Sequence, residues 1–383
     1  MEHKKDDLGL AIDEVITPMS PPSTAHGYNV ENSASPQLGS SHIEQFPAKE
    51  SPSTEAPSTL SPLGGVTSPF AEHGALIDGK RKGKKAANAG LGWPRIRRAF
   101  REPLSEFLGV FILIMFGDGV VAQVVLSKGE KGDYQSISWG WGLGVMLGVY
   151  CSGISGAHLN PAVTFANCVF RKFPWKKFPT YVLAQTLGAM CAAGVVYANY
   201  KSAIDQYEGG SMRTVPGFSE NATAGIFCTY PAEFMTKTGQ FFSEFIASTL
   251  LMFLIYALKD DGNLGAGAFT PLGLFFIIFG IGACFGWETG YAINLARDFG
   301  PRLMSYFLGY GHEVWSAGNY YFWVPMVAPF FGCTFGGFLY DALLFTGQSP
   351  INTPYWGFYR LVPSLRKEYE GMTWDVTKED SEV

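Results

Sequence analysis

Two distant stretches of this chain share a sequence pattern typical of a helix N-terminus, and each follows a long apolar segment. Residues 155–163 read Ser-Gly-Ala-His-Leu-Asn-Pro-Ala-Val, and residues 289–297 read Thr-Gly-Tyr-Ala-Ile-Asn-Leu-Ala-Arg. In each copy a Gly lies four residues, and a Ser or Thr five residues, before the Asn. Asn is a favoured N-cap, because its side-chain oxygen accepts a hydrogen bond from a free backbone N–H. Pro161 takes the first helical position of the first copy, where its missing N–H costs nothing, whereas the second copy has Leu295 there.

The surroundings of these two caps distinguish them from the Asn-headed helices that are common in soluble proteins. Both caps follow long apolar segments, and both begin helices too short to cross a bilayer. The segment from Asn160 to Arg171 rises roughly 18 Å, which is about half a membrane. The pattern therefore predicts two re-entrant half-helices, one starting at Asn160 and one at Asn294.

Six further segments have the length and composition of membrane-spanning helices. Each is apolar with almost no charged residues, as the hydrocarbon core of a bilayer requires. Soluble all-helical packing is the alternative, and six such runs argue against it. We expect an all-α membrane protein with six transmembrane helices and two re-entrant half-helices. The predicted spans lie near residues 103–126, 136–153, 179–199, 240–258, 269–287 and 321–345.

The remainder of the chain of 383 residues is polar. Residues 1–98 are rich in Ser, Thr and Pro, a composition that cannot bury enough apolar surface to fold, and we expect a disordered cytoplasmic tail. A channel domain would occupy residues 99–345, and residues 346–383 would form a second cytoplasmic tail. Whether the first tail is phosphorylated or is an inert solvated segment stays open. The net charge of −5 does not suggest a nucleic-acid partner.

Charged residues between the apolar segments predict the orientation in the membrane. Basic residues cluster before the first span and at residues 171–177, and positive charge favours the cytoplasmic side. The long loop 200–239 would then lie outside, and it contains a glycosylation sequon at Asn221. An even number of spans places both termini in the cytoplasm. We expect a multi-pass protein of the plasma membrane.

The two halves of the predicted channel domain repeat each other. Ser-Glu-Phe opens the first span at residues 105–107 and the fourth at residues 243–245. Because each half has an odd number of spans, the second copy, about residues 240–345, is inverted relative to the first, about residues 103–199. Inverted repeats with broken helices indicate a central site at the bilayer midplane. A carboxylate inside a membrane needs donors, so we expect Glu106 and Glu244 each to brace one re-entrant loop; a position at the interface is the alternative.

The sequence shows no pattern typical of an enzyme, a metal site or a cofactor site. The six Cys have no metal-ligand or disulfide spacing, and no nucleophile–base pair is legible. We therefore expect no cofactor, no metal and no catalytic residue. His158 is a lone histidine near the first cap, and it is either a residue lining the cytoplasmic half of a pore or a packed, hydrogen-bonded one.

These motifs resemble those of the aquaporin superfamily, over about residues 103–345. The stretch 155–163, the sequence Asn-Leu-Ala-Arg-Asp-Phe-Gly-Pro-Arg at 294–302 and the paired Ser-Glu-Phe starts carry the likeness. Asp298 and Trp141 resemble the aquaglyceroporin branch, and the long N-terminal tail resembles its fungal members. Leu295 departs from the family pattern, in which Pro is usual, and this leaves pore width and rate in question.

The resemblance implies a passive channel that conducts glycerol, other small neutral solutes and water while excluding protons and ions. It places Asn160, Pro161, Ala162, Asn294, Leu295 and Ala296 at the pore midplane, and Trp141, Gly282, Tyr291 and Arg297 in a selectivity filter. A membrane-interface aromatic belt remains an alternative for the two aromatics, as does a snorkelling or Asp298-paired role for Arg297. The family also implies a homotetramer in the lipid bilayer and, beside glycerol and water, possible passage of urea or other small polyols. Alternative functions for the chain are those of a water-selective channel, an alternating-access transporter and an intramembrane enzyme.

Overall fold

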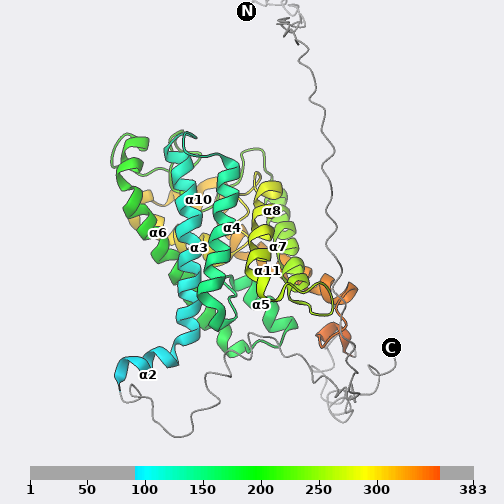
Figure 1. The fold of residues 1–383 in the computed structure, drawn as a ribbon. Coiled ribbons are helices and arrows are strands. Elements are labelled where there is room, and N and C mark those ends of the chain that lie inside the picture. The colour runs from blue at the N-terminus through cyan, green and yellow to red at the C-terminus, as the bar shows by residue number, and fades with distance from the viewer. Residues whose placement is uncertain (1–90, 354–383) are drawn as a thin grey trace, which may run out of the picture. The chain divides into compact units, whose positions relative to one another are not determined.

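The computed structural model describes residues 91–353, and the regular secondary structure of this part is entirely helical (Figure 1). Within it, six helices are long and apolar enough to cross a membrane. They are α3 (Arg101–Leu126), α4 (Tyr134–Ser152), α6 (Phe178–Glu208), α7 (Lys237–Lys259), α8 (Thr270–Phe285) and α11 (Trp323–Leu343). The predicted fold class, an all-α membrane protein, is confirmed.

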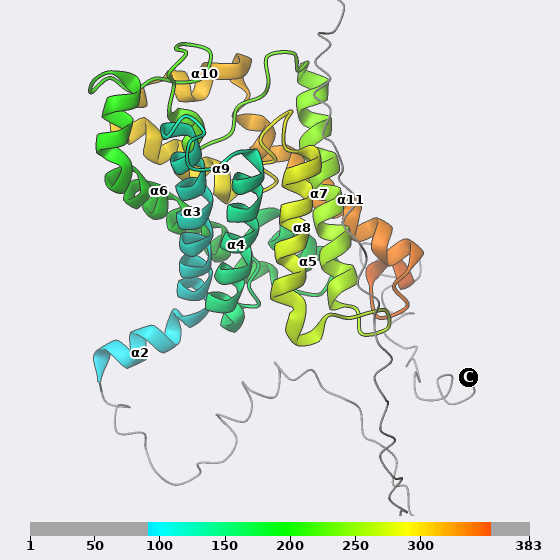
Figure 2. The same ribbon diagram turned by 45° about the horizontal axis from the view of Figure 1, so that its top comes forward.

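Two short helices lie between the long ones. Helix α5 (Pro161–Phe170) follows α4, and helix α9 (Leu295–Ser305) follows α8, as the two Asn-headed motifs predict. Figure 2 shows α5 and α9 at different heights among the long helices. Further short helices are α2 (Gly92–Ala99) and α10 (Glu313–Tyr320).

The helices of the two halves pack by the same scheme. Helix α3 contacts α4 and α6, and the corresponding helix α7 contacts α8 and α11. Helices α4 and α8 join the halves. Each short helix packs on the last span of the opposite half, α5 on α11 and α9 on α6. The halves are therefore interlocked, and neither short helix has its packing surface without the other half.

A glycine allows a close helix contact at corresponding positions in each half. A Cβ added at Gly188 of α6 would lie 2.3 Å from the carbonyl oxygen of Phe107 on α3. A Cβ at Gly332 of α11 would lie 2.4 Å from the carbonyl oxygen of Phe245 on α7. Phe107 and Phe245 are the last residues of the two Ser-Glu-Phe motifs. Small residues let membrane helices approach closely, so the repeat in sequence is also a repeat in packing.

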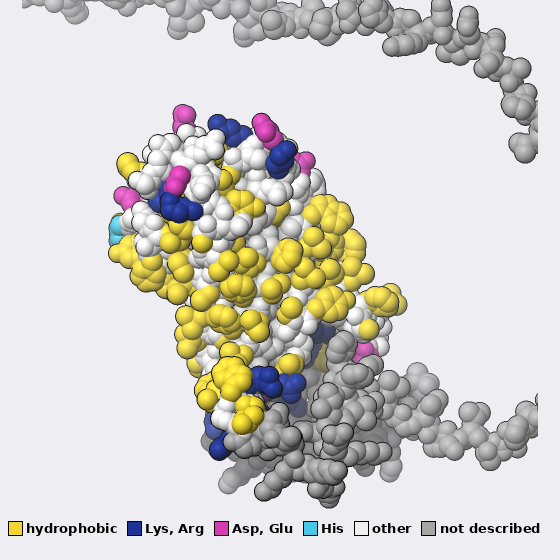
Figure 3. All heavy atoms as spheres, turned by 60° about the vertical axis from the view of Figure 1, so that its left-hand side comes forward, with side chains coloured by type: hydrophobic (Ala, Val, Ile, Leu, Met, Phe, Trp, Pro, Cys, Tyr) yellow, Lys and Arg dark blue, Asp and Glu magenta, His cyan; other side chains and the backbone are white. Residues whose placement is uncertain are grey.

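The outer surface of the described part carries many exposed apolar side chains. Figure 3 shows a broad hydrophobic belt, with charged side chains gathered toward the ends of the molecule. Exposed residues on the spanning helices include Leu108, Phe116, Leu183, Phe242, Phe276 and Phe331. A soluble protein rarely exposes so large an apolar patch, whereas lipid covers it in a membrane. The protein is thus a multi-pass membrane protein.

The structure differs from the sequence predictions at the helix ends. Helix α6 continues to Glu208, beyond the apolar run that ends near residue 199, and stops where Gly209 adopts φ 76°. Helix α2 lies in the segment predicted to be a disordered tail. Its sequence, Gly92–Ala99, mixes apolar and basic residues, which a helix can place on different faces. At the other end a short helical turn, Pro350–Asn352, lies in the predicted C-terminal tail. The rest of both predicted tails lies outside the described residues.

Candidate functional site

The loops that precede the two half-helices have the same unusual backbone. Before α5, Ala157 and Leu159 have φ of 51° and 53°, and before α9, Tyr291 and Ile293 have φ of 38° and 42°. Non-glycine residues with positive φ are strained by about 1–3 kcal/mol each, and such strain persists only where the surroundings enforce it. The matching positions in the two loops show that both are held in one geometry.

Glu106 is the acceptor at the centre of the first loop. This side chain is fully buried on α3, and its two oxygens accept from the backbone N–H groups of His158 and Leu159 at 2.9 and 2.8 Å. The Ser155 hydroxyl donates to it at 2.6 Å and the Gln185 amide at 2.8 Å. A buried charge with this many donors is well compensated.

Glu244 has the same position in the second loop. It is fully buried on α7, and it accepts from the backbone N–H groups of Ala292 and Ile293 at 2.9 and 2.7 Å. The Tyr321 hydroxyl adds a weaker contact at 3.4 Å. Each carboxylate therefore accepts from the two residues that lie two positions and one position before the Asn cap.

The two Asn side chains join the half-helices to each other. Asn160 caps α5 by accepting from the Ala162 N–H, and Asn294 caps α9 by accepting from the Ala296 N–H, both at 2.9 Å. The Asn160 amide then donates to the carbonyl of Ile293 at 2.7 Å. In return, the Asn294 amide donates to the carbonyl oxygen of Leu159 at 2.8 Å. The N-termini of α5 and α9 consequently meet head to head.

A cavity of about 70 Å³ runs past this junction. A single water needs about 10–15 Å³, so the cavity has room for several. The lining is mostly aliphatic, with polar groups from the two re-entrant loops, from Arg297 of α9 and from Lys259 at the end of α7. Lining residues include Leu113, Val145, Val149, Leu251, Ile255, Leu274, Ile278, Trp141, Tyr291, Arg297, His158, Asn160 and Asn294. The remaining midplane candidates Pro161, Ala162, Leu295 and Ala296 are not among the lining residues.

Arg297 and Trp141 lie together in the cavity wall. The Arg297 guanidinium carbon is 4.0 Å from the centre of the Trp141 ring, and its Nη1 donates to the carbonyl oxygen of Phe227 at 3.0 Å. Asp118 Oδ1 is 3.9 Å from the same nitrogen. Guanidinium has five N–H donors, so donors remain for a molecule in the cavity.

Gly282 contributes to the site by making room for Tyr291. A Cβ at position 282 would lie 2.8 Å from both the Cζ and the hydroxyl oxygen of Tyr291. The Tyr134 hydroxyl donates to the Gly282 carbonyl at 3.0 Å. The Tyr291 ring occupies the space beside Gly282 and lines the cavity, whereas Gly282 is not among the lining residues.

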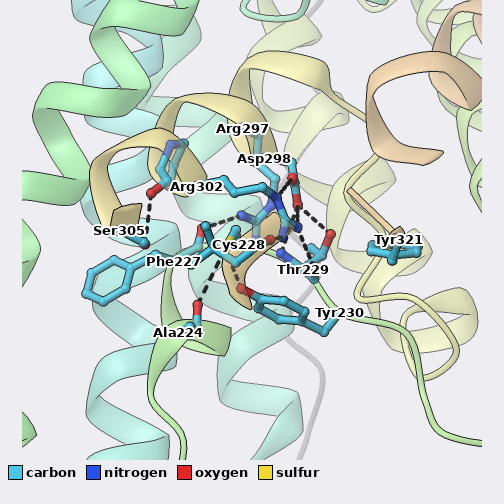
Figure 4. A network of polar contacts seen from close by, with 12 residues as sticks. Ala224, Phe227, Cys228, Thr229, Tyr230, Arg297, Asp298, Arg302, Ser305 and Tyr321 are labelled. Carbon is cyan, nitrogen blue, oxygen red and sulfur yellow. Dashed lines mark hydrogen bonds and ion pairs between the residues drawn. The ribbon is translucent and has the colours of Figure 1, made fainter. Parts of the chain in front are cut away.

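Asp298 forms its ion pair with Arg302 and not with Arg297. Arg302 Nε lies 2.7 Å from Asp298 Oδ1, and both side chains are buried. Asp298 also accepts from the backbone N–H and the hydroxyl of Thr229, while Arg302 donates to the Thr229 carbonyl oxygen at 2.6 Å. Figure 4 shows how this network fastens α9 to the segment that includes Phe227, the acceptor of Arg297.

Comparison with known proteins identifies this arrangement. Residues 95–340 match the family described as major intrinsic protein. The chain belongs to the major intrinsic protein family. It is 75% identical over 296 residues to "Aquaglyceroporin-9" of Botryotinia fuckeliana, covering 77% of this chain and 65% of that protein. It is 73% identical over 278 residues to "Probable aquaglyceroporin-2" of Gibberella zeae, covering 72% of this chain and 82% of that one.

A solved structure supports the same assignment. The X-ray structure of the aquaglyceroporin from Plasmodium falciparum is 35% identical, with a TM-score of 0.57, covering 63% of this chain and 96% of that chain. The resemblance to the aquaporin superfamily and its aquaglyceroporin branch is confirmed. As a major intrinsic protein the chain is a channel protein and not an enzyme.

The other candidate residues of this major intrinsic protein lie as follows. His158 lines the cavity, its Nδ1 is 3.2 Å from the Thr164 hydroxyl, and its ring packs on Phe173 and Tyr181, so both roles expected for it coexist. Asn221 is exposed after α6. Among residues 91–353, no group of His, Cys, Asp and Glu could hold a metal ion.

Sequence reasoning missed Asp118, the acidic residue nearest to Arg297 in the structure. A signal was present, because Asp118 is a carboxylate in the middle of the first apolar span. A carboxylate within a membrane helix is a candidate functional residue by default. The sequence prediction covers only Glu106 and Glu244, which lie at the ends of their spans.

Proposed function

We propose that this protein is a passive channel for glycerol and water that excludes protons and ions. The observation that carries the proposal is the reciprocal pair of hydrogen bonds between Asn160 and Asn294, within a cavity that both residues line. It joins two helix N-termini inside a membrane protein, beside a cavity lined mostly by aliphatic side chains. The names of the fungal relatives, aquaglyceroporins, agree with this function.

The helix junction explains the exclusion of cations and protons. Each helix N-terminus carries about +0.5 elementary charge, so two of them facing each other repel positive charge. Each Asn amide has two N–H groups, and one is used for the opposite carbonyl. The other N–H of each amide is free to donate to a passing oxygen. An oxygen that accepts from both turns its own hydrogens away, which interrupts proton relay.

The wall around Arg297 explains passage of a polyol. Arg297 offers donors to hydroxyl groups, while Trp141 and Tyr291 present apolar ring surface for the carbon chain. Glycerol has hydroxyl groups along one edge and C–H groups along the other, and the wall has the complementary pair of surfaces. The positive guanidinium adds a second barrier to cations at this point.

Stopped-flow swelling of proteoliposomes that contain the purified protein, with water, glycerol and urea, tests this function. We expect glycerol and water fluxes that rise linearly with the gradient and do not change with an imposed proton gradient. Saturation, or coupling to protons, would favour an alternating-access transporter instead. Rapid water flux with no glycerol flux would favour a water-selective pore.

The assembly, the orientation and the membrane of residence are part of the proposal. We propose a homotetramer in the plasma membrane with both termini in the cytoplasm, and with Asn221 on the outer side. Urea and other small polyols are further candidate solutes, since the wall makes no demand beyond a neutral molecule with hydrogen-bonding groups. Protease accessibility from each side of sealed vesicles tests the orientation.

A further inference from the structure

Asp118 is the exception among the buried carboxylates of the described residues. Both of its oxygens are inaccessible to solvent, and neither has a hydrogen-bond partner. By contrast, Glu106, Glu244 and Asp298 are equally buried and each accepts several hydrogen bonds. A buried polar group without donors is destabilising, and a native structure that keeps one needs a reason for it.

Asp118 lies close to two residues that line the cavity, Trp141 and Arg297. It lies on α3 directly after Gly117, and a Cβ at Gly117 would lie 2.3 Å from the Trp141 ring. Trp141 in turn stacks on Arg297, and Asp118 Oδ1 is 3.9 Å from Arg297 Nη1. Asp118 is not among the residues that line the cavity. It is therefore buried beside the Arg297 guanidinium and outside the lining of the cavity.

Two groups draw the same guanidinium nitrogen toward the wall. The Phe227 carbonyl oxygen accepts directly from Nη1 at 3.0 Å. Asp118 is too far for a hydrogen bond, but opposite charges attract strongly where water is excluded. The other charged groups near this point, Asp298 and Arg302, compensate each other in their own pair. Asp118 is thus the acidic residue placed to offset the charge of Arg297.

We propose that Asp118 is a positioning residue of the pore: as the counter-charge of Arg297, it holds the guanidinium back against the wall and keeps the constriction wide enough for glycerol. This rests on the proposed function. Without the carboxylate, Arg297 keeps the Phe227 carbonyl oxygen and the Trp141 ring as partners but no counter-charge, and it leans toward the lumen. A guanidinium in the lumen narrows the path more for glycerol than for water.

This role explains why an unfavourable group is retained. Removing one partner of a buried ion pair is destabilising because the other charge is then uncompensated, whereas neutral groups in place of both partners are often tolerated or stabilising. If Asp118 served only to fill space, Asn or Leu would fill it at least as well. The structure therefore predicts that loss of the Asp118 charge lowers both stability and selectivity while Arg297 is present, and raises stability once Arg297 is absent.

The experiment compares Asp118→Asn, Asp118→Glu, Arg297→Ala and the double variant Asp118→Asn/Arg297→Ala in proteoliposomes. Stopped-flow swelling gives the ratio of glycerol to water flux, and thermal unfolding of the purified proteins gives the midpoint. Ala122→Ser is the matched control, since it adds a buried polar group one turn further along the same face of α3. We expect Asp118→Asn to lower the unfolding midpoint, because Arg297 loses its counter-charge, and to lower the flux ratio by about threefold, a modest coupling between neighbours.

The coupling to Arg297 is the decisive readout. Asp118→Asn should not change the flux ratio when Arg297 is already Ala, and Asp118→Glu, which keeps the charge, should restore most of the wild-type ratio. Asp118→Asn should lower the unfolding midpoint of the wild-type protein but raise that of the Arg297→Ala protein, where the carboxylate has lost its counter-charge.

Three results would overturn the inference. They are an unchanged flux ratio in Asp118→Asn, an equal fall of the flux ratio in the Arg297→Ala background, and a change in the unfolding midpoint on Asp118→Asn that is the same with and without Arg297. If the wild-type protein conducts no glycerol, the proposed function fails. The coupling between Asp118 and Arg297 is then still read from the unfolding midpoints, and additive midpoints would contradict it.

Discussion

The two half-helices begin with the same cap and then carry different residues. At the same two distances from the cap, α5 has Thr164 and Cys168, whereas α9 has Asp298 and Arg302. Thr164 donates back to the cap carbonyl within its own helix, while the Asp298–Arg302 pair reaches Thr229 in the segment between α6 and α7. The repeat thus conserves the junction, and only the second copy is fastened to an outer segment.

This difference indicates that the two half-helices have different roles in the channel. Arg297 comes from the second half-helix, and its acceptor Phe227 belongs to the segment that Arg302 holds. In the first half, the Thr164 hydroxyl instead accepts from the Gln185 amide of α6 at 3.2 Å, and no ion pair at Thr164 and Cys168 corresponds to that of Asp298 and Arg302. We infer that the second half-helix carries the filter, and that the first supplies the opposing helix terminus.

Removing the fastening should have the largest effect. Arg302→Leu leaves the buried Asp298 charge uncompensated and two carbonyl oxygens, those of Thr229 and Val314, without this donor. We expect a loss of about 3–5 kcal/mol in the free energy of unfolding, measured by denaturant titration of the purified protein.

The matched control for this variant is Lys177→Gln, which breaks the exposed pair with Glu102. Exposed ion pairs contribute about 0–1 kcal/mol, so the control should unfold almost as the wild type does. Equal losses in the two variants would show that the second half-helix is not held in the way described.

Removing either brace should have an intermediate and symmetric effect. Glu106→Leu and Glu244→Leu each leave two loop N–H groups without their carboxylate acceptor. We expect each to lose about 2–3 kcal/mol of unfolding free energy, since water in the pore reaches part of the loop. Denaturant titration of both variants side by side checks this, and tolerance of one change with collapse of the other would break the symmetry.

Removing the filter charge should leave the fold intact and open the barrier. We expect Arg297→Ala to retain glycerol flux and to raise cation or proton leak by roughly tenfold, since a focused positive field is lost. Ion flux assays in proteoliposomes measure it, with Asn221→Gln as an exposed control outside the pore. Ion exclusion equal to that of the wild type would remove Arg297 from the filter.

The first helical residue of α9 should matter least. Leu295→Pro gives α9 the same first residue as α5, which begins with Pro161. The N–H that proline lacks has no partner within the helix at this position. We expect a gain of about 0.5 kcal/mol from a less flexible unfolded chain, with glycerol flux unchanged. A large change in flux would show that Leu295 sets the pore width after all.

Much of the junction could be predicted from local sequence, because caps and spans are local signals. Asn160 and Asn294 were recognisable as caps, and the lengths of the apolar runs located the six spans. The carboxylates Glu106 and Glu244 followed from the cost of a charge in lipid. For these residues, elementary chemistry leaves few alternatives.

What could not be predicted depends on contacts between distant segments. The Asn amides bond to carbonyls of the opposite loop, which no spacing in the sequence reveals. The sequence suggests Arg297 as a possible partner of Asp298, whereas in the structure Asp298 pairs with Arg302 and accepts from Thr229. The end of α6 was also hidden, since a helix can leave the membrane and continue to the next glycine.

The most direct test measures glycerol and proton flux in the same vesicles. Proteoliposomes with the wild-type protein and an enclosed pH-sensitive dye would be given a glycerol gradient and a proton gradient together. Two opposed helix termini capped by Asn160 and Asn294 predict fast swelling while the internal pH follows that of protein-free vesicles. Internal acidification at a rate that scales with the glycerol flux would contradict the account.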